Sequence, residues 1–434
     1  MNFAVVSLCL LACGVTAVPT PHQHLVVTVE TNTDAQVDIL RAAADTDHEL
    51  DFWTHPRMGL TDVMVPWRRF NQLKDAWTAA GMKVKVMQED VEAMIRNVDA
   101  QNLLYKQRRT ARAGTTLDHD FYRSYAQYID GLRSLRSQYS NLMRFDESGN
   151  SVPRNKTIEG RIIHFVELGA NLDSRPVIML EVNIHAREWV TSASDFYMID
   201  SLVSNYGSDA DATFLLDNFH LVIIPVANPD GYEFSRTSSN TRLWRKNRRY
   251  VGGIFSCYGV DLNRNFNAFW QGSGYCTSDS YPGTSYNSEP ETNAVESIFR
   301  RFQNNMVIYL PVHCYSQVLL LPWSYQSTNS IVNARHRDYG NAMGAAMKAS
   351  SGRNYGVGTA YATIGYAAAG TSGDWALVEK QGSNSNFISI AYELRPAPGA
   401  GTGGFILPAS DIVPTGRELL ASVLAVAKRN FNES

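Results

Sequence analysis

The pattern of hydrophobic and polar positions changes character near residue 119. Before that point, short apolar stretches alternate with segments of helical periodicity, in the order strand, helix, strand, helix, strand, helix. This order predicts a small α+β unit over residues 25–107. The elements that we expect in it are strands at 25–30, 63–66 and 82–87 and helices at 37–44, 68–80 and 89–108.

From about residue 119 onward, near-continuous apolar runs alternate with longer helical patterns. Runs without polar alternation are typical of strands that are buried on both faces of a mostly parallel sheet. The pattern therefore predicts an α/β domain with helices on both faces of the sheet. The apolar runs lie at 177–184, 220–228, 305–313 and 387–394, and the helical patterns at 191–206, 289–303, 335–349 and 415–430.

A basic segment, KQRRTAR at 106–112, separates the two regions and is followed by Ala-Gly-Thr-Thr. Exposed polar linkers are the usual sites of proteolytic nicking, and paired basic residues are what trypsin-like proteases cut. By itself such a run is equally consistent with a plain linker. Its position between two predicted domains favours processing at Arg109 or Arg112.

The first 17 residues have the features of a signal peptide. An apolar stretch from Phe3 to Val15 is followed by small residues that end at Ala17. The stretch is too short to span a bilayer, and no later segment approaches about 18 uninterrupted apolar residues. The net charge of -3 gives no field that would recruit nucleic acid. We therefore expect a secreted protein that binds neither membranes nor nucleic acid.

The cysteines agree with export. Removal of residues 1–17 leaves Cys257, Cys276 and Cys314. A disulfide between Cys257 and Cys276 would close a loop of about 20 residues and stabilise the fold by about 3 kcal/mol in the chain-entropy model. Cys314 is then expected to be a buried structural thiol.

The segment HARE at 185–188 directly follows a predicted buried strand. An imidazole and a carboxylate three residues apart lie on one face of a turn, and both bind zinc. This short pattern is common by chance, so a metal site needs a third ligand. His313 supplies one, because it ends the apolar run 305–313 and open α/β sheets bind ligands at the carboxyl ends of their strands. Three protein ligands leave one zinc position open for water, as in catalytic sites.

Further motifs follow in order along the chain: HAREW at 185–189, NPDGYEF at 228–234, LWRKNRR at 243–249, VDLNRNF at 260–266, PVHCYSQ at 311–317 and YELR at 392–395. With these motifs the chain resembles the secreted metallocarboxypeptidases, the family of the pancreatic procarboxypeptidases A and B and their invertebrate digestive relatives. The resemblance covers nearly the whole chain after the signal peptide. It implies an eight-stranded mixed sheet flanked by helices, preceded by a ferredoxin-like prosegment.

The resemblance also implies one Zn²⁺ ion held by His185, Glu188 and His313. Asp261 then orients His185 through the second ring nitrogen, which is the usual outer-shell arrangement. Glu393 is the implied general base, because a carboxylate beside a metal can take a proton from the attacking water.

The basic run acquires a function in the same way. The resemblance implies that Arg245 stabilises the oxyanion that develops on the scissile carbonyl. It implies that Asn263, Arg264 and Tyr366 grip the terminal carboxylate of the substrate, since a guanidinium binds a carboxylate through two N–H groups. The accessory substrate-site arginines are Arg187 and Arg242, whereas we expect Lys246, Arg248 and Arg249 to be solvated surface.

The side-chain pocket departs from the best-known members of the family. Typical A-type enzymes carry an apolar residue, and typical B-type enzymes an Asp, at the position of Gly373. Ser324 matches the B-type choice, where A-type enzymes have Gly. Asp374 matches a residue present in both types. The pattern favours basic C-terminal residues, and A-type or broad specificity is the alternative.

The sequence thus predicts a signal peptide at 1–17, an activation prosegment at 18–112 and a zinc carboxypeptidase domain at 113–434. We expect a monomeric zymogen with a digestive role, peptide substrates and a trypsin-like activating protease. One alternative is a binding homologue without activity, but the implied ligands and the base are present. The other is an intracellular enzyme that trims acidic tails, against which the signal peptide and the prosegment argue.

Overall fold

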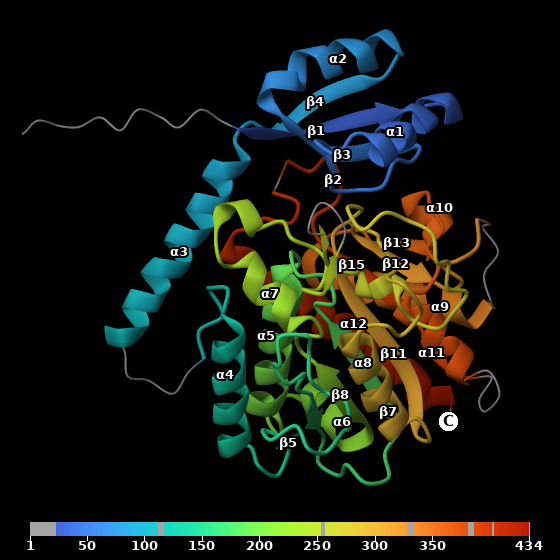
Figure 1. Cartoon of the computed structure of the whole chain (residues 1–434). Helices are drawn as coiled ribbons and strands as arrows, with labels where there is room; N and C mark the ends of the chain where they lie inside the picture. Colours follow the sequence, from blue (N-terminus) through green and yellow to red (C-terminus); the bar gives the residue numbers. More distant parts are fainter. Residues whose placement is uncertain are drawn as a thin grey trace, which may run out of the picture.

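The structure is a computed structural model that describes residues 23–111, 117–252, 257–327, 334–380, 386–401 and 403–433. It consists of a small N-terminal α+β unit that sits above a larger α/β domain (Figure 1). The predicted signal peptide at 1–17 lies outside the described residues.

The N-terminal unit is a four-stranded antiparallel sheet in the order β2-β3-β1-β4, with helices packed against it. The order of elements matches the prediction and adds the two-residue strand β2. The central strand β1 is almost wholly buried, whereas β4 alternates between more and less exposed side chains. The elements are β1 (His24–Thr31), α1 (Asp34–Thr46), β2 (Asp51–Phe52), β3 (Gly59–Pro66), η1 (Trp67–Arg69), α2 (Phe70–Ala79), β4 (Lys83–Gln88) and α3 (Val91–Ala111).

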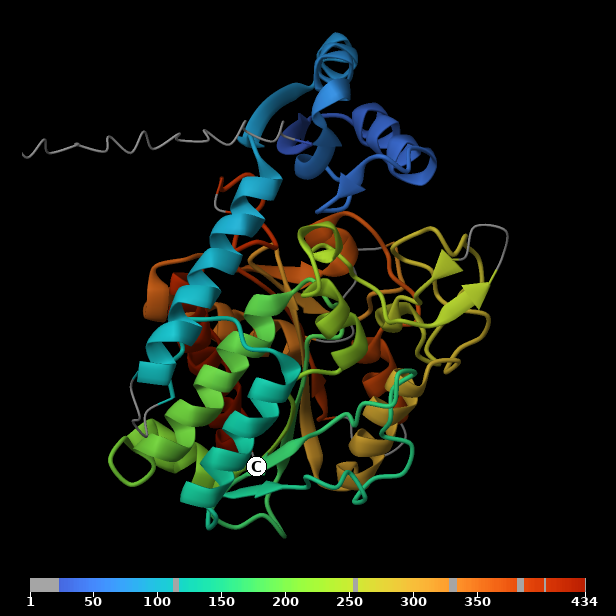
Figure 2. The same ribbon diagram turned by 60° about the vertical axis from the view of Figure 1, so that its left-hand side comes forward.

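Helix α3 leaves the N-terminal unit and extends along the outside of the larger domain (Figures 1 and 2). It continues to Ala111, three residues beyond the predicted end. Arg109 therefore lies within a helix and not in an irregular linker. Arg112, the other predicted cut site, lies outside the described residues.

The larger domain is built on a mixed sheet in the order β13-β12-β15-β11-β7-β8-β6-β5. Strand β14 also pairs with β11, just before β15 along the chain, so nine strands fill the eight predicted positions. The central pairs β11–β7, β7–β8 and β11–β15 are parallel, and antiparallel pairs lie toward both edges. The strands are β5 (Met143–Phe145), β6 (Val166–Leu168), β7 (Val177–Val182), β8 (His220–Ile224), β11 (Met306–Cys314), β12 (Val318–Leu321), β13 (Gly356–Thr359), β14 (Ile388–Ser389) and β15 (Ala391–Leu394).

Helices cover both faces of this sheet. Alternate residues of β7 enter two separate cores: Ile178 and Leu180 pack with α5, α9 and α12, whereas Val177 and Met179 pack with α8 and α11. This two-sided burial explains why β7 shows no polar alternation in the sequence. The helices are α4 (Tyr125–Gln138), α5 (Trp189–Asn205), α6 (Ala210–Asn218), α7 (Pro229–Ser235), α8 (Pro290–Phe302), α9 (Ala334–Ser351), α10 (Ala360–Ile364), α11 (Ser372–Lys380) and α12 (Ile412–Glu433).

The short elements lie in the connections: η2 (Ser239–Thr241), β9 (Tyr250–Gly252), β10 (Cys257–Tyr258), η3 (Leu262–Arg264) and η4 (Ala409–Asp411). The predicted disulfide joins Cys257 to Cys276, with 6.0 Å between their Cα atoms. Cys314 is a buried free thiol, as expected.

The expectation of solvated surface is wrong for Lys246 and Arg248, whereas Arg249 is partly exposed but held in an ion pair. Lys246 is buried, and its Nζ donates to the carbonyls of Cys276 and Ser278. Arg249 pairs with the buried Glu289 at 2.7 Å, and the Arg248 guanidinium stacks on aromatic rings. Lys246 and Arg248 thus contact the disulfide-bridged segment, whereas Arg249 contacts the start of α8, and the charge pattern alone reveals none of these partners.

Candidate active site

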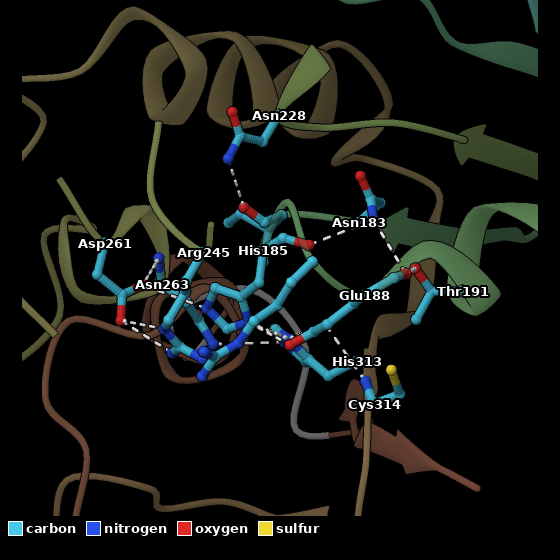
Figure 3. A network of polar contacts seen from close by, with 12 residues as sticks. Asn183, His185, Glu188, Thr191, Asn228, Arg245, Asp261, Asn263, His313 and Cys314 are labelled. Atoms are coloured by element: carbon cyan, nitrogen blue, oxygen red, sulfur yellow. Dashed lines mark hydrogen bonds and ion pairs between the residues drawn. The ribbon is translucent and has the colours of Figure 1, made fainter. Parts of the chain in front are cut away.

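Three side chains that can hold a metal converge at the carboxyl ends of β7 and β11. The parallel register pairs Val182 with Val312, so the chain beyond each strand emerges at the same edge of the sheet. His185 and Glu188 follow β7, and His313 is the penultimate residue of β11. Their ligand atoms all lie within 4.8 Å of one another, and all three residues are buried. Figure 3 shows the three side chains pointing toward one another.

The loop between β7 and α5 is held by side chains outside this set. Asn183, with a φ of 57°, donates from Nδ2 to the carbonyls of His185 and Glu188. Asn228 donates to the carbonyl of Ile184 (3.1 Å). Glu188 occupies the N-cap position of α5 but makes no capping bond, because its carboxylate is turned to His185. The loop conformation therefore directs the Glu188 carboxylate toward the metal position, and the first N–H groups of α5 receive no cap from it.

The donor set fits a zinc ion. Nδ1 of His185 lies 2.8 Å from Glu188 Oε1 and 3.1 Å from Nδ1 of His313. Burial raises the pKa of Glu188, but His185 and His313 outweigh it and lower the pKa to about 2, so this carboxylate is ionised. Two imidazole nitrogens and one carboxylate that face a common point are the ligands of a catalytic zinc site, with a fourth position left for water.

Asp261 fixes the orientation of His185. Its buried carboxylate lies 3.2 Å from Nε2 of His185, and it can only accept there, so the Nδ1 lone pair points to the metal position. The same carboxylate accepts from Nε and Nη2 of Arg245 at 3.2 and 2.9 Å. Burial raises the pKa of Asp261, but Arg245, Arg264 and His185 hold it well below its usual range. Asp261 thus connects His185, at the metal position, to Arg245 (Figure 3).

The three predicted carboxylate-gripping residues lie together. Arg264 donates from Nη2 to the Tyr366 hydroxyl at 3.1 Å and from Nη1 to the Asn263 carbonyl at 2.7 Å. The Asn263 side chain accepts from the Ser372 N–H at 2.9 Å, and its Nδ2 lies 3.3 Å from His313 Nε2. These groups line the same cleft as the metal-binding set.

Glu393 lies beside His313, because β15 pairs with β11 in a register that places these two residues opposite each other. Burial and the charge of Glu188 raise the pKa of Glu393 to about 8, against the opposing effect of Arg245, Arg264 and Arg57. A carboxyl group whose pKa lies near neutrality, next to a metal position, can accept and return a proton.

The predicted side-chain pocket opens beside this set, and Ser324 and Gly373 both line it. Asp374 is buried and accepts from the N–H groups of Ser324 and Tyr325 at 2.9 to 3.1 Å. Burial raises the pKa of Asp374 to about 6. Both of its oxygens are bonded, so Asp374 shapes the pocket and does not present a free acceptor to it.

The two accessory arginines have different surroundings. Arg187 lines the cleft and contacts Asp51 of the N-terminal unit at 3.2 Å and Asp279 at 3.4 Å. Arg242 is not part of the cleft lining among the described residues. Its guanidinium stacks on Trp189 at 3.7 Å and donates to two backbone carbonyls, those of Arg187 and Phe405. Arg242 therefore supports the loop that carries Arg187.

The N-terminal unit reaches into this cleft. The connection between β2 and β3 places His55 against Tyr366, with ring centroids 3.5 Å apart, and Arg57 in the electrostatic neighbourhood of Glu393. Burial lowers the pKa of His55 far below its usual value, and the Arg264 and Arg245 charges lower it further. The sequence predicted an activation prosegment, but no motif pointed to His55 or Arg57, because nothing in a short connection between two strands shows what it faces.

Comparisons with known proteins agree with this geometry. The zinc carboxypeptidase family profile matches residues 128–422, and the carboxypeptidase activation peptide profile matches residues 27–97. The chain is 31% identical to carboxypeptidase A1 of Sus scrofa, in an alignment that covers 94% of each protein. It is 32% identical to metallocarboxypeptidase A of Trichophyton rubrum, in an alignment that covers 98% of each protein.

Solved structures show the same fold. A structure of thrombin activatable fibrinolysis inhibitor superposes with a TM-score of 0.80 at 25% identity, over 95% of this chain and 100% of that one. Carboxypeptidase A from Helicoverpa armigera gives 0.78 at 27% identity, over 94% and 98%.

The chain therefore belongs to the zinc carboxypeptidase family and is a metallocarboxypeptidase zymogen that carries the family's activation peptide. Within the described part of the chain, no helix is long and apolar enough to cross a membrane.

Proposed function

We propose that this enzyme removes single residues from the C-terminal ends of peptides, with one zinc ion held by His185, Glu188 and His313. The observation that carries the proposal is the convergence, in one buried cleft, of a metal-binding set, a carboxyl group at β15 and a carboxylate-binding cluster. The cluster explains exopeptidase action, because an internal peptide bond offers no carboxylate to Arg264.

Each residue then has a chemical role. A bound zinc ion supplies a Lewis acid that activates water for attack on the scissile carbonyl. Glu393 accepts a proton from the attacking water at its carboxylate and returns it to the leaving amine. Arg245, held by Asp261, donates N–H groups to the developing oxyanion. Arg264, Asn263 and Tyr366 bind and orient the terminal carboxylate.

We further propose a preference for basic C-terminal residues. Ser324 makes one wall of the pocket polar, and Gly373 removes side-chain bulk at its floor. A β-carbon at residue 373 would meet Ser389 Oγ at 3.4 Å and Pro311 at 3.8 Å, which are ordinary contact distances, so the glycine leaves open at the floor the space that a side chain of this residue would take. The relatives named carboxypeptidase A make A-type or broad specificity the competing outcome.

The remaining proposals concern the segments of the zymogen and its activation. We propose a signal peptide at 1–17, a prosegment at 18–112 and an enzyme domain at 113–434, secreted as a monomer with a digestive role. Proteases bind extended chain, so the helical setting of Arg109 favours Arg112 as the point of cleavage by a trypsin-like enzyme. Trypsin treatment followed by N-terminal sequencing of the product distinguishes the two sites.

The test of the proposed function is Glu393→Gln in the trypsin-activated enzyme. Turnover of a C-terminally free peptide should fall at least about a hundredfold, which is the low end of typical general-base contributions, while the KM changes little. Glu379→Gln, a solvent-side carboxylate of α11, is the matched control and should keep full activity. Exhaustive chelation should abolish turnover, and added zinc should restore it. Undiminished activity of Glu393→Gln or of the metal-free enzyme would contradict the assignment.

A further inference from the structure

The floor of the side-chain pocket continues into a buried polar cluster behind Gly373. Ser389 donates from Oγ to the carbonyl of Gly373 at 2.9 Å, and its own oxygen retains lone pairs that can accept. The Ser372 hydroxyl is buried and lies close enough to the Tyr309 hydroxyl to lower the pKa of Tyr309, which leaves the lone pairs of the serine oxygen able to accept. Both serines therefore have acceptor capacity that the protein itself does not use.

A buried acid without a cation partner among the described residues lies beyond Ser372, to which Tyr309 connects it. Glu181 of β7 is fully buried, and the Tyr309 hydroxyl donates to its Oε2 at 2.5 Å. Its other oxygen, Oε1, has no hydrogen-bond partner in the described part of the chain, where no ion pair to Glu181 is found either. Burial and the negative charge of Glu181 raise the pKa of Tyr309 well above its usual value, and the nearby Ser372 hydroxyl lowers it.

The sheet register places Glu181 one strand away from the pocket. Glu181 pairs with Pro311, and paired residues of neighbouring strands point to the same face of a sheet. Pro311 lines the cleft and is one of the two contacts that a β-carbon at residue 373 would make. Ser372, which also lines the cleft, lies between the pocket and the Tyr309–Glu181 pair.

Neighbouring acids cannot supply the same negative charge. Both oxygens of Asp374 accept backbone N–H groups. Glu296, which also acts on Tyr309, pairs with Arg300 at 3.0 Å. Among the described residues around the floor, Glu181 is thus the buried acid that has no cation partner and one oxygen free to accept, so a cation at the floor would give it the partner that the protein does not supply.

We propose that Glu181 determines the specificity of the pocket by attracting the ammonium group of a C-terminal lysine, which binds at Ser372 and Ser389 in front of it. This inference rests on the proposed carboxypeptidase function and deepens it. The ammonium group has three N–H donors, and the floor offers two hydroxyl acceptors backed by the Glu181 charge. The pocket walls, which include Leu320, Ile364 and Ala391, suit the methylene stem of lysine.

Arginine fits this floor less well. Its planar guanidinium brings five N–H donors in a rigid fork, and two hydroxyl groups leave most of them unpaired. The inference therefore ranks lysine above arginine, and both above an uncharged side chain of equal length.

The experiment compares kcat/KM of the trypsin-activated enzyme on peptides that differ only in the last residue: lysine, arginine or norleucine. Norleucine keeps the stem of lysine and lacks the ammonium group. Wild type should prefer lysine to norleucine, and Glu181→Gln should lower the lysine/norleucine ratio at least tenfold while norleucine turnover stays within about threefold. The ratio is independent of the fraction of active enzyme. Glu181→Asp, which restores the charge, should recover part of the ratio.

Glu296→Gln is the matched control, because it removes a charge near Tyr309 that already has its own cation, and it should leave the ratio unchanged. Where Glu181→Gln does not fold, Ser372→Ala decides, since it deletes the hydroxyl between the charge and the substrate and should also lower the ratio. An unchanged ratio in folded Glu181→Gln, or a wild-type preference for norleucine, would overturn the proposal and leave the carboxypeptidase function intact. Failure to hydrolyse any of the peptides would instead refute the proposed function.

Discussion

The contact between Asp51 and Arg187 is one of several that join the activation peptide to the enzyme domain, and its removal has a calculable effect. Asp51 of β2 lies 3.2 Å from the Arg187 guanidinium, whose side chain is 4% exposed. Replacing Asp51 by Asn deletes the charge but keeps the shape. Burial raises the pKa of Asp51, and the Arg187 charge opposes that shift, so the carboxylate depends on this partner for its ionised form.

The magnitude follows from what Arg187 keeps in the variant. A buried charge left without any partner costs about 3–5 kcal/mol. Arg187 retains Asp279 at 3.4 Å and the Leu243 carbonyl at 3.5 Å, so the loss should lie nearer to that of one hydrogen bond to a charged group, about 1.5–3 kcal/mol. Since 1.4 kcal/mol corresponds to a factor of ten, the open fraction of the uncut zymogen should rise about 10-fold to 100-fold.

The assay is the residual activity of the uncut zymogen on a small blocked dipeptide, expressed as a fraction of its activity after trypsin treatment. Asp51 leaves with the activation peptide, so wild type and Asp51→Asn yield the same mature enzyme, which provides an internal standard. Asp45→Asn, an exposed position of α1, is the control and should behave as wild type. A residual activity of Asp51→Asn within twofold of wild type would refute the reasoning.

Two further predictions concern the site and the core. Asp261→Asn should lower kcat/KM by at least tenfold and weaken zinc affinity by 10-fold to 100-fold, measured by competition with a chelator, because His185 loses its orienting carboxylate; unchanged zinc affinity would show that Asp261 does not orient the ligand. Burial lowers the pKa of His336 to about 4, so the unfolded chain binds this proton first as pH falls from about 6.5 to about 4. Protonation of this residue should therefore lower the unfolding free energy by about 3 kcal/mol over that interval, and above about pH 6.5 this contribution to stability is fully present. Urea unfolding at pH 7 and pH 4.5 tests this, because the unfolding free energy of His336→Gln should fall less between the two pH values than that of wild type. An equal fall in both proteins would contradict this origin.

The sequence predicted the metal-binding set because each ligand can be recognised from its position next to a strand. His185, Glu188 and His313 each follow or end a strand without polar alternation, and parallel strands bring their carboxyl ends to one edge. The helix and strand order of the activation peptide was predicted for the same reason, since periodicity reports which face of an element is buried.

What the sequence could not show depends on contacts between distant segments. Lys246 was expected at the surface because a run of cations is usually solvated, yet its partners are carbonyls about 30 positions away, in the disulfide-bridged segment. His55 belongs to a connection whose neighbour in space, Tyr366, lies more than 300 positions downstream. Glu181 occupies a strand that is apolar in every other respect, and only the register with Pro311 relates it to the pocket.

The metal-binding set joins the ends of two strands whose ligands, His185 and His313, are 128 positions apart along the chain. In the unfolded chain only His185 and Glu188 remain near each other, so an ion at this site binds the native state far more tightly than the unfolded one. Mass action then links the two equilibria, and every tenfold rise of free zinc above its dissociation constant adds about 1.4 kcal/mol to the unfolding free energy. The melting temperature of this enzyme is therefore a function of the zinc activity of the medium around it.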